Sequence, residues 1–376
     1  MALSTRLADL RPSPIRQILS VIDRDGMVSF AGGLPAAATF PDFDLALPPE
    51  ILQYGPSEGD PELRAEVAES LTRLGIDAPP ERVMILSGSQ QGIDLVAKLF
   101  IDPGTPVALE APTYLAALQA FRFFGAAFTP LRWDAAPAAP LAYVVPTFAN
   151  PTGRCATDAE RRTLGTLCGE AGVTLFEDDP YRDLVYGPAD RAPVVAGMAG
   201  ASWIYQGSFS KTMAPGLRLG FLAASDDLFA PLVMLKQASD LHSSRVGQHL
   251  VLRELRSGDR PRRLSELAAF YAARRDTFEA ALRRHLGGLA DWRTPQGGLF
   301  FWLRLRHAID TRALLAEALD EGVAFMPGED FYPGEPVLGT MRLNFSHASP
   351  EQAERGLATL ASLLRARETP VPSSKG

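Results

Sequence analysis

The sequence contains few lysines, and one of them stands where chemistry is expected. Only four of the 37 basic residues are lysine, and Lys211 follows an apolar run within Ser-Phe-Ser-Lys-Thr-Met-Ala-Pro-Gly-Leu-Arg-Leu-Gly (208–220). A lysine amine becomes a nucleophile and a base when burial and neighbouring positive charge lower its pKa. Lys98 and Lys236 fall in predicted helices and Lys375 in the C-terminal tail, so these three are poorer candidates.

Further polar residues follow apolar runs that are predicted to be short strands. The predicted strands cover residues 83–86, 106–109, 142–145, 173–176, 202–205 and 219–223, and they alternate with helical segments. After the first five strands come residues 87–90, Glu110, Asn150, residues 177–179 and residues 206–211. Ligands of open α/β sheets bind at the carboxyl ends of the strands. The sequence therefore predicts one site that combines a lysine, carboxylates, an amide and serine-containing turns.

These motifs together resemble those of the class I/II aminotransferases of fold type I, the aspartate-aminotransferase-like enzymes that depend on pyridoxal 5'-phosphate. Asn-Pro-Thr-Gly (150–153) and Asp-Asp-Pro-Tyr (178–181) precede the lysine motif, and Arg-Leu-Asn-Phe (342–345) follows it. The resemblance extends from Phe30 to about residue 364. It implies an α/β fold in which a large domain with a mainly parallel central sheet is joined to a smaller α+β C-terminal domain.

The resemblance also implies roles for the residues that would bind the cofactor. Lys211 would carry the cofactor aldehyde as a Schiff base and move the proton between the substrate α-carbon and the cofactor. Asp178 would keep the pyridine nitrogen protonated, which makes the ring an electron sink. Tyr114 would stack on the pyridine face, and Tyr54 would reach the phosphate of the neighbouring subunit in a homodimer. The remaining cofactor-binding residues would be Ser89, Gln90, Asn150, Tyr181, Ser208, Ser210 and Arg218.

Substrate recognition is assigned in the same way. Arg342 would pair bidentately with the substrate α-carboxylate, and Asn150 and Gly33 would contact the substrate as well. Arg16, in Ser-Pro-Ile-Arg (13–16), resembles the arginine of the 2-aminoadipate and kynurenine aminotransferases that meets a polar substrate end. The resemblance thus implies transfer of an amino group from an L-amino acid with a large or polar side chain to a 2-oxo acid such as 2-oxoglutarate.

Two features depart from that subgroup and bear on the substrate. The segment between Tyr114 and Asn150 is shorter than is usual, and Ala149 stands where a longer polar residue is frequent. A shorter segment would open or reshape the substrate pocket. These departures affect the choice of substrate more than the reaction.

Other classes of protein use some of the same residue patterns. A Ser-x-x-Lys pair is also typical of penicillin-recognising hydrolases, but the Ser-Asp-Asn and Lys-Thr-Gly elements that those enzymes need are missing. A cofactor-sensing regulator would need a DNA-binding module before Phe30, and only about 30 residues stand there. The serious alternative is an enzyme with the same fold and cofactor but another reaction, such as a β-lyase, a decarboxylase or a biosynthetic tailoring enzyme.

The composition agrees with a soluble, cytoplasmic enzyme. The chain has 376 residues, of which 46% are hydrophobic and 22% charged, and its net charge of −7 argues against nucleic acid as a partner. The two cysteines have no His or Cys neighbours at zinc spacing, so no metal is expected, and no apolar run reaches the ~18 residues of a membrane span. We expect an N-terminal arm (1–30) with a helix at 12–24, a large domain (31–245) and a small domain (246–376).

A few more elements complete the prediction. Proline at position 61 predicts the start of a helix, and further helices are expected at 92–100, 264–285 and 311–321. In the small domain, residues 297–303, 323–326 and 340–345 are predicted to be strands.

Overall fold

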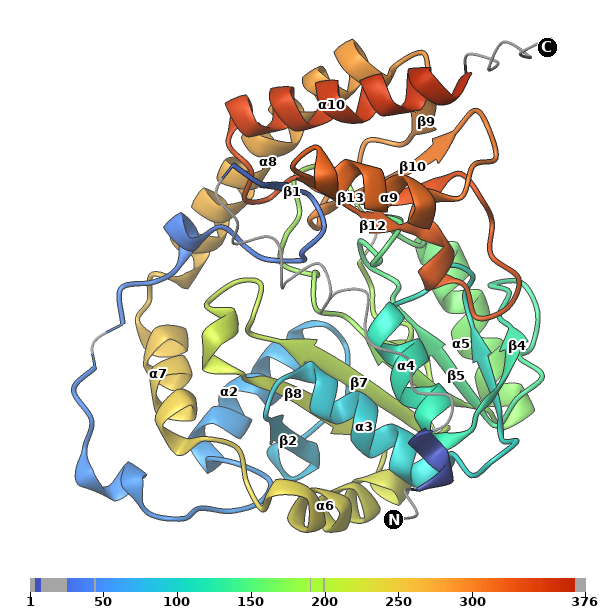
Figure 1. Cartoon of the computed structure of the whole chain (residues 1–376). Coiled ribbons are helices and arrows are strands. Elements are labelled where there is room, and N and C mark those ends of the chain that lie inside the picture. Colours follow the sequence, from blue (N-terminus) through green and yellow to red (C-terminus); the bar gives the residue numbers. More distant parts are fainter. Residues whose placement is uncertain (1–3, 8–25, 44, 190, 199, 369–376) are drawn as a thin grey trace, which may run out of the picture.

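The computed structural model describes residues 4–7, 26–43, 45–189, 191–198 and 200–368. In Figure 1 a larger unit with a central sheet lies below a smaller unit that contains the C-terminal strands and helices. The helix expected at 12–24, and Arg16 with it, lie outside the described residues. No helix in the described part of the chain is long and apolar enough to cross a membrane.

A seven-stranded sheet forms the centre of the larger unit. Its strands lie in the order β2-β8-β7-β6-β5-β3-β4. All neighbouring pairs are parallel except those of β8, which runs antiparallel to both β2 and β7. The mainly parallel sheet is therefore confirmed. The bounds are β2 (Val83–Leu86), β3 (Pro106–Leu109), β4 (Ala127–Pro130), β5 (Leu141–Val144), β6 (Thr174–Asp178), β7 (Trp203–Ser208) and β8 (Gly220–Ala224).

The sequence pattern does not reveal β4. This strand is half exposed at the edge of the sheet and ends in Pro130, so it lacks the buried apolar run that marks its neighbours. Proline cannot donate a ladder hydrogen bond and is tolerated at an edge.

Helices cover both faces of this sheet. One face packs with α3 (Ser89–Phe100), α4 (Leu115–Phe124) and α6 (Asp226–Asp240), and the other with α2 (Pro61–Arg73), α5 (Asp158–Ala171) and α7 (Arg245–Arg256). The Asp60 side chain caps α2 by accepting from two backbone amides, which satisfies N–H groups that the first helical turn leaves free. The helix predicted at 92–100 begins three residues earlier, at Ser89, directly after the left-handed Gly88 (φ +84°).

The smaller unit is an α+β layer, as expected. Its four strands lie in the order β12-β13-β10-β9 and are all antiparallel to their neighbours. A separate pair joins β1 (Val28–Ser29) to β11 in parallel. The bounds are α8 (Arg260–Leu286), β9 (Ala290–Trp292), β10 (Phe300–Leu305), α9 (Thr311–Asp320), β11 (Val323–Ala324), β12 (Met326–Pro327), β13 (Thr340–Asn344) and α10 (Pro350–Glu368).

Two strand predictions in this unit need correction. The strand expected at 297–303 begins at Phe300, because Gly297 and Gly298 form the turn against Phe148 that precedes it. The run expected as one strand at 323–326 is divided into β11 and β12, because each half pairs with a different strand.

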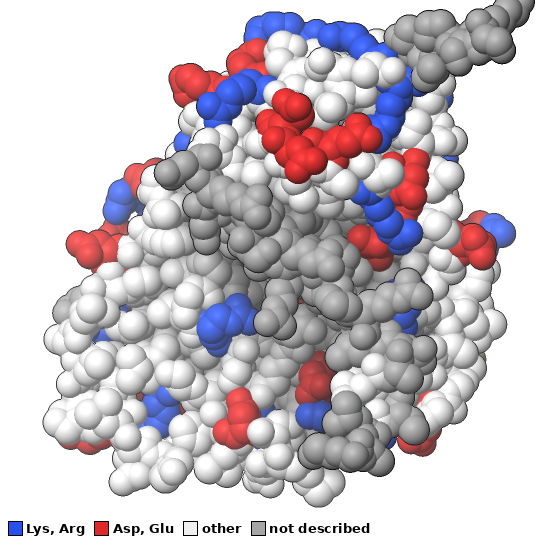
Figure 2. Space-filling view, in the orientation of Figure 1, with Lys and Arg blue, Asp and Glu red and all other residues white. Residues whose placement is uncertain are grey.

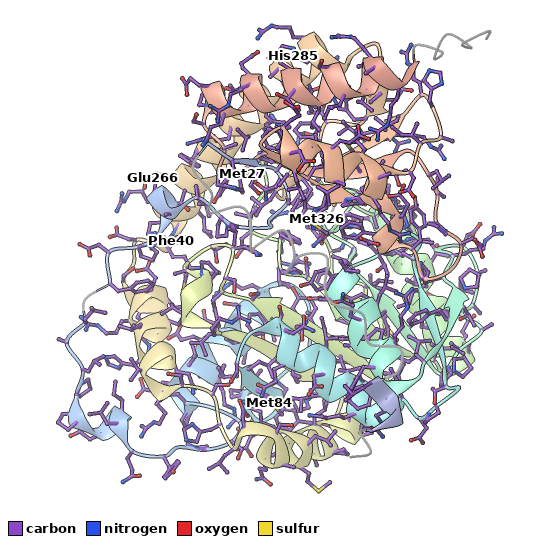
Figure 3. All side chains as sticks on the ribbon, in the orientation of Figure 1. Met27, Phe40, Met84, Glu266, His285 and Met326 are labelled. Carbon is purple, nitrogen blue, oxygen red and sulfur yellow. The ribbon has the colours of Figure 1, made fainter. Side chains whose placement is uncertain are left out.

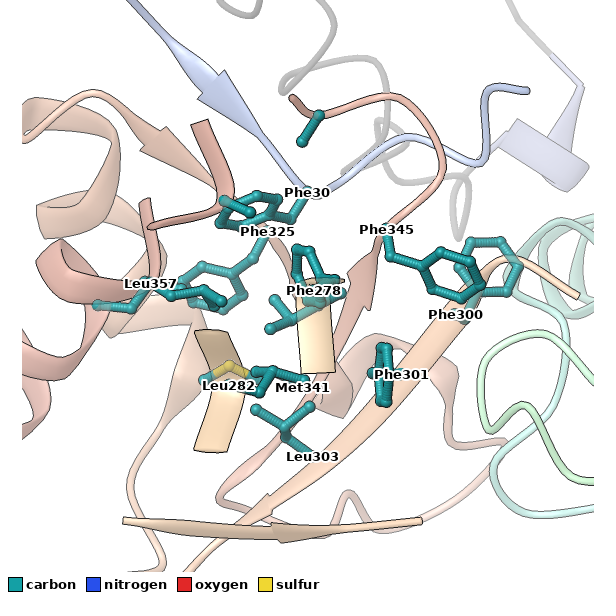
Figure 4. Packing of buried hydrophobic residues seen from close by; sticks show 14 of the residues in the cluster. Phe30, Phe278, Leu282, Phe300, Phe301, Leu303, Phe325, Met341, Phe345 and Leu357 are labelled. Carbon is teal, nitrogen blue, oxygen red and sulfur yellow. The ribbon is translucent and has the colours of Figure 1, made fainter. Parts of the chain in front are cut away.

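An aromatic core holds the smaller unit together. Phe30 packs edge-on against Phe278 of α8, and Phe278 stacks on Phe301 of β10. Figure 4 shows these rings beside Met341 and Leu357. Phe30 thereby ties the segment that leads to Gly33 to the C-terminal strands.

Side chains fill the junction of the two units, where Met326 lies (Figure 3). Short 3-10 helices occupy Thr5–Leu7, Ala37–Thr39, Pro49–Leu52, Pro80–Arg82, Val195–Gly197, Pro215–Leu217 and Gly328–Phe331.

Candidate active site

The candidate site lies where the carboxyl ends of β6 and β7 meet the smaller unit. Lys211 follows β7, and its Nζ donates a hydrogen bond of 2.9 Å to the backbone oxygen of Gly33, a residue 178 positions earlier. The same Nζ lies 6.0 Å from the centre of the Tyr181 ring. Three segments that are distant in the sequence therefore converge on the amine of Lys211.

Asp178 is the last residue of β6, and each oxygen of its buried carboxylate accepts one hydrogen bond. The Tyr143 hydroxyl donates to Oδ2 over 2.8 Å, and the Gln206 side-chain amide donates to Oδ1 over 3.0 Å. Burial raises the pKa of Asp178 to about 6 although both hydrogen bonds favour the ionised form. The carboxylate is thus ionised at neutral pH and suited to hold a cation in a buried place.

Tyr143 and Gln206 are candidate site residues that the motifs do not reveal. Both lie inside apolar strands next to β6, and Gln206 is in register with Asp178. The only signal in the sequence is a polar group within each apolar run. Gly92 on α3 makes room for this amide, because a Cβ at that position would lie 1.8 Å from Gln206 Oε1.

Electrostatics also tune the amine of Lys211. Burial lowers its pKa to about 8, and the positive charges of Arg342 and Arg218 act in the same direction. About a tenth of the amine is therefore unprotonated at pH 7, far more than for an ordinary lysine. This is the state in which a lysine acts as a nucleophile or as a base.

Arg342 on β13 is a buried guanidinium with one N–H that none of the described residues accepts. Its Nη1 donates to Asn150 Oδ1 over 2.7 Å, and its Nη2 donates to the backbone oxygen of Ala31. Phe300 and Phe331 flank it, with ring centres 4.3 and 5.2 Å from Cζ. Its Nε has no hydrogen-bond partner among the described residues. Such an atom, buried and unpaired, is costly unless a ligand accepts its hydrogen bond.

Tyr114 and Tyr181 place two phenols beside these charges. Burial raises the pKa of Tyr114 to about 12, and the charge of Asp178 adds to this. Burial likewise raises the pKa of Tyr181, which hydrogen-bonds with Asn150 and packs edge-on against Phe300 at 5.7 Å. Both phenols are neutral near pH 7 and can donate hydrogen bonds.

A second group of residues forms a cradle at the start of α3. Arg218 has a left-handed backbone (φ +51°) and lies so close to Gly88 that a Cβ there would be 2.5 Å from Nη2. A Cβ at Gly220 would be 3.0 Å from the backbone nitrogen of Ser89. The backbone nitrogens of a helix N-terminus next to an arginine favour an anion such as phosphate.

The two serines of the lysine motif lie in the same turn region. The backbone N–H of Ser210 donates to Ser208 Oγ over 3.2 Å, which orders the turn before Lys211. The Gln90 side chain is exposed, so its contribution to an anion site would come from its backbone.

Tyr54 is separate from this group. It is 76% exposed, and its ring packs edge-on against His242 at 5.7 Å. The structure of one chain therefore does not bring Tyr54 into the site of that chain.

The residues 34–360 match the model of the family aminotransferase class I and II. The chain belongs to this family. It is 33% identical to aromatic-amino-acid aminotransferase 1 of Thermococcus litoralis over 96% of this chain and 94% of the relative.

Two solved structures agree with this assignment. An alpha-aminoadipate aminotransferase from Thermus thermophilus, complexed with N-(5'-phosphopyridoxyl)-L-leucine, has a TM-score of 0.87 at 35% identity and 97% coverage of both chains. A kynurenine aminotransferase from Pyrococcus horikoshii in complex with PMP has a TM-score of 0.90 at 33% identity and 98% coverage of both chains. The chain is thus a fold type I, pyridoxal-phosphate-dependent aminotransferase.

The side chains of the site fit this cofactor. The cradle of Gly88, Ser89 and Arg218 suits the phosphate, and the buried carboxylate of Asp178 suits a protonated pyridine nitrogen. The unpaired Nε of Arg342 suits the carboxylate of an amino acid. In the described ranges, no group of three or more His, Cys, Asp or Glu side chains is arranged to hold a metal ion.

Proposed function

We propose that this aminotransferase acts on L-amino acids with large or polar side chains, such as 2-aminoadipate or aromatic amino acids, and passes the amino group to a 2-oxo acid such as 2-oxoglutarate. The observation that carries the proposal is Arg342, whose buried guanidinium presents an unpaired Nε in the same site as the amine of Lys211. The names of the similar enzymes support this substrate class.

The proposed roles follow from charge and hydrogen bonding. Arg342 binds the substrate carboxylate and, with Asn150, fixes its orientation. Asp178 holds a proton at the ring nitrogen of the cofactor. When bound, pyridoxal phosphate withdraws electrons from the α-carbon of the amino acid. Lys211 is the attachment point of the cofactor and, with its lowered pKa, moves the proton at the α-carbon.

We also propose a homodimer in which Tyr54 contributes to the partner's phosphate site. Large apolar side chains are exposed along residues 45–54 and on and after α6, namely Leu45, Leu47, Leu52, Tyr54, Met234 and Leu241. On the face shown in Figure 2, Lys, Arg, Asp and Glu side chains are sparser over the larger unit, below, than over the smaller unit, above. Such exposed apolar surface favours an interface. Sedimentation should give twice the chain mass, and Tyr54→Phe should weaken cofactor binding.

The substrate is tested by a panel of L-amino acids assayed against 2-oxoglutarate, with both glutamate and the product 2-oxo acid measured. Equal amounts of the two products are expected, and the highest kcat/KM should fall on 2-aminoadipate or an aromatic amino acid. A product formed without glutamate would instead favour a lyase or a decarboxylase.

Arg16 remains the proposed contact for polar substrate ends. Arg16→Ala should lower kcat/KM for 2-aminoadipate more than for leucine. An equal loss on both substrates would contradict this role.

A further inference from the structure

A buried lysine outside the proposed catalytic group lies behind the cradle. Lys236 on α6 is 0% exposed, and its ammonium donates three hydrogen bonds, to Gln91 Oε1 (2.8 Å), Asp240 Oδ1 (2.7 Å) and Ser243 Oγ (2.9 Å). An ammonium has three donors, so every one of them is used. Burial of a charged lysine costs free energy, so we expect a lysine in such a place to hold neighbouring groups in position.

The acceptors of Lys236 are also the partners of Ser87. The Ser87 backbone N–H donates to Gln91 Oε1 over 2.8 Å, and its hydroxyl donates to Asp240 Oδ2 over 2.7 Å. Ser243 Oγ lies 3.1 Å from the same hydroxyl and donates to the backbone oxygen of Ile85. Both the main chain and the side chain of Ser87 are thus fixed through the two groups that Lys236 orients.

Ser87 directly precedes the turn that begins α3. The next residue is Gly88, whose backbone is left-handed and intrinsically free, and the one after it is Ser89, the first residue of α3. Arg218 closes on Gly88 from its other side. The direction of the N–H groups at the start of α3 therefore depends on how firmly Ser87 is held.

We propose that Lys236, with Asp240 and Gln91, is a positioning cluster that fixes the phosphate-binding turn, so that it determines the preference for a phosphorylated over an unphosphorylated pyridoxal. The inference rests on the proposed placement of the cofactor phosphate at the cradle of Gly88, Ser89 and Arg218. Lys236 acts through Ser87 and touches neither the substrate nor the reacting atoms.

The test compares the dissociation constants of pyridoxal 5'-phosphate and pyridoxal, measured by absorbance titration of the cofactor-free protein. Lys236→Met should weaken binding of pyridoxal 5'-phosphate by about tenfold or more. It should leave binding of pyridoxal within about twofold of the native value. A lysine that only stabilised the fold would change both constants alike.

Lys98→Met is the matched control. Lys98 on α3 also reaches α6, because its Nζ donates to Ser239 Oγ (3.0 Å), and it pairs with Asp94 of its own helix (2.6 Å). Its side chain is 33% exposed, and it has no contact with Ser87 among the bonds described. Both dissociation constants should stay native in this variant.

Ser87→Ala keeps the test valid if Lys236→Met does not fold, because it removes only the hydroxyl that reaches Asp240. Ser87→Ala should also lower the preference for pyridoxal 5'-phosphate over pyridoxal. In the double variant Lys236→Met/Ser87→Ala the effects of the two substitutions on this preference should not add. The proposal is overturned if both single variants keep the native preference for pyridoxal 5'-phosphate, or if they lose affinity for both ligands equally.

Arg218→Ala distinguishes a failure of this inference from a failure of the proposed phosphate site. A lost preference in Arg218→Ala but not in Lys236→Met or Ser87→Ala would show that the phosphate binds at the cradle without help from the cluster. If Arg218→Ala also kept the native preference, the placement of the phosphate itself would be wrong, and the inference with it.

Discussion

Removal of the Tyr143 hydroxyl should shift the ionisation of Asp178 and, with it, the pH dependence of cofactor binding. Burial raises the pKa of Asp178 to about 6, and the hydrogen bonds from Tyr143 and Gln206 keep it from rising further. A hydrogen bond to a charged group contributes about 1.5–3 kcal/mol, and one pKa unit corresponds to about 1.4 kcal/mol. In Tyr143→Phe the pKa of Asp178 should therefore rise by about one to two units.

The assay is the affinity of the cofactor-free protein for pyridoxal 5'-phosphate across a pH series. Asp178 binds the protonated ring nitrogen only when it is ionised, so affinity in the native protein should fall as the pH drops through about 6. In Tyr143→Phe this fall should begin at a higher pH, near neutrality.

Tyr205→Phe is the control, because Tyr205 is also a buried strand tyrosine but its hydroxyl donates to Asp179, over 3.1 Å. The reasoning would be refuted if the pH profiles of cofactor affinity were the same in Tyr143→Phe and the native protein. It would also be refuted if Tyr205→Phe shifted this profile as much as Tyr143→Phe does.

Three further predictions concern the lysine, the arginine and the glycine of the site. Lys211→Ala should lower transamination by at least about 10²-fold. In the cofactor-free native protein, the rate of acylation of Lys211, followed by peptide mapping, should have its midpoint near pH 8. A midpoint near the pKa of an ordinary lysine would contradict this. Arg342→Ala should raise KM for amino and oxo acids by about 10²-fold while pyridoxal phosphate stays bound, so loss of the cofactor would count against it. Gly92→Ala should lower the free energy of unfolding in urea by about 1–3 kcal/mol through the clash with Gln206, whereas Gly288→Ala, with nothing within 4 Å of its Cβ, should be neutral.

The parts of the site that the sequence predicts are those at strand ends. Asn150, Asp178 and Lys211 each follow or end an apolar run, and the rule that ligands bind at carboxyl ends places them together without knowledge of strand order. Arg342 is different, because it lies inside β13 and comes from the other unit. Its place in the site is expected only from the resemblance of its motif.

The parts that the sequence does not predict depend on register and helix packing. Tyr143 and Gln206 reach Asp178 only because β5, β6 and β7 are adjacent and aligned, which no short motif specifies. In the sequence Lys236 resembles an ordinary residue of a long helix, and its burial results from the contact of α6 with the start of α3. Local sequence patterns describe one element at a time, whereas these contacts each join two.

The charges of the site explain why it should bind two anions together. Lys211, Arg218 and Arg342 are close enough for both arginines to lower the pKa of the lysine, whereas Asp178 accepts its hydrogen bonds from Tyr143 and Gln206 rather than from these cations. An anion at Arg218 or Arg342 would offset this repulsion and raise the pKa of Lys211 again. The phosphate and the substrate carboxylate would therefore each offset part of the positive charge of the site as well as anchor their own molecules.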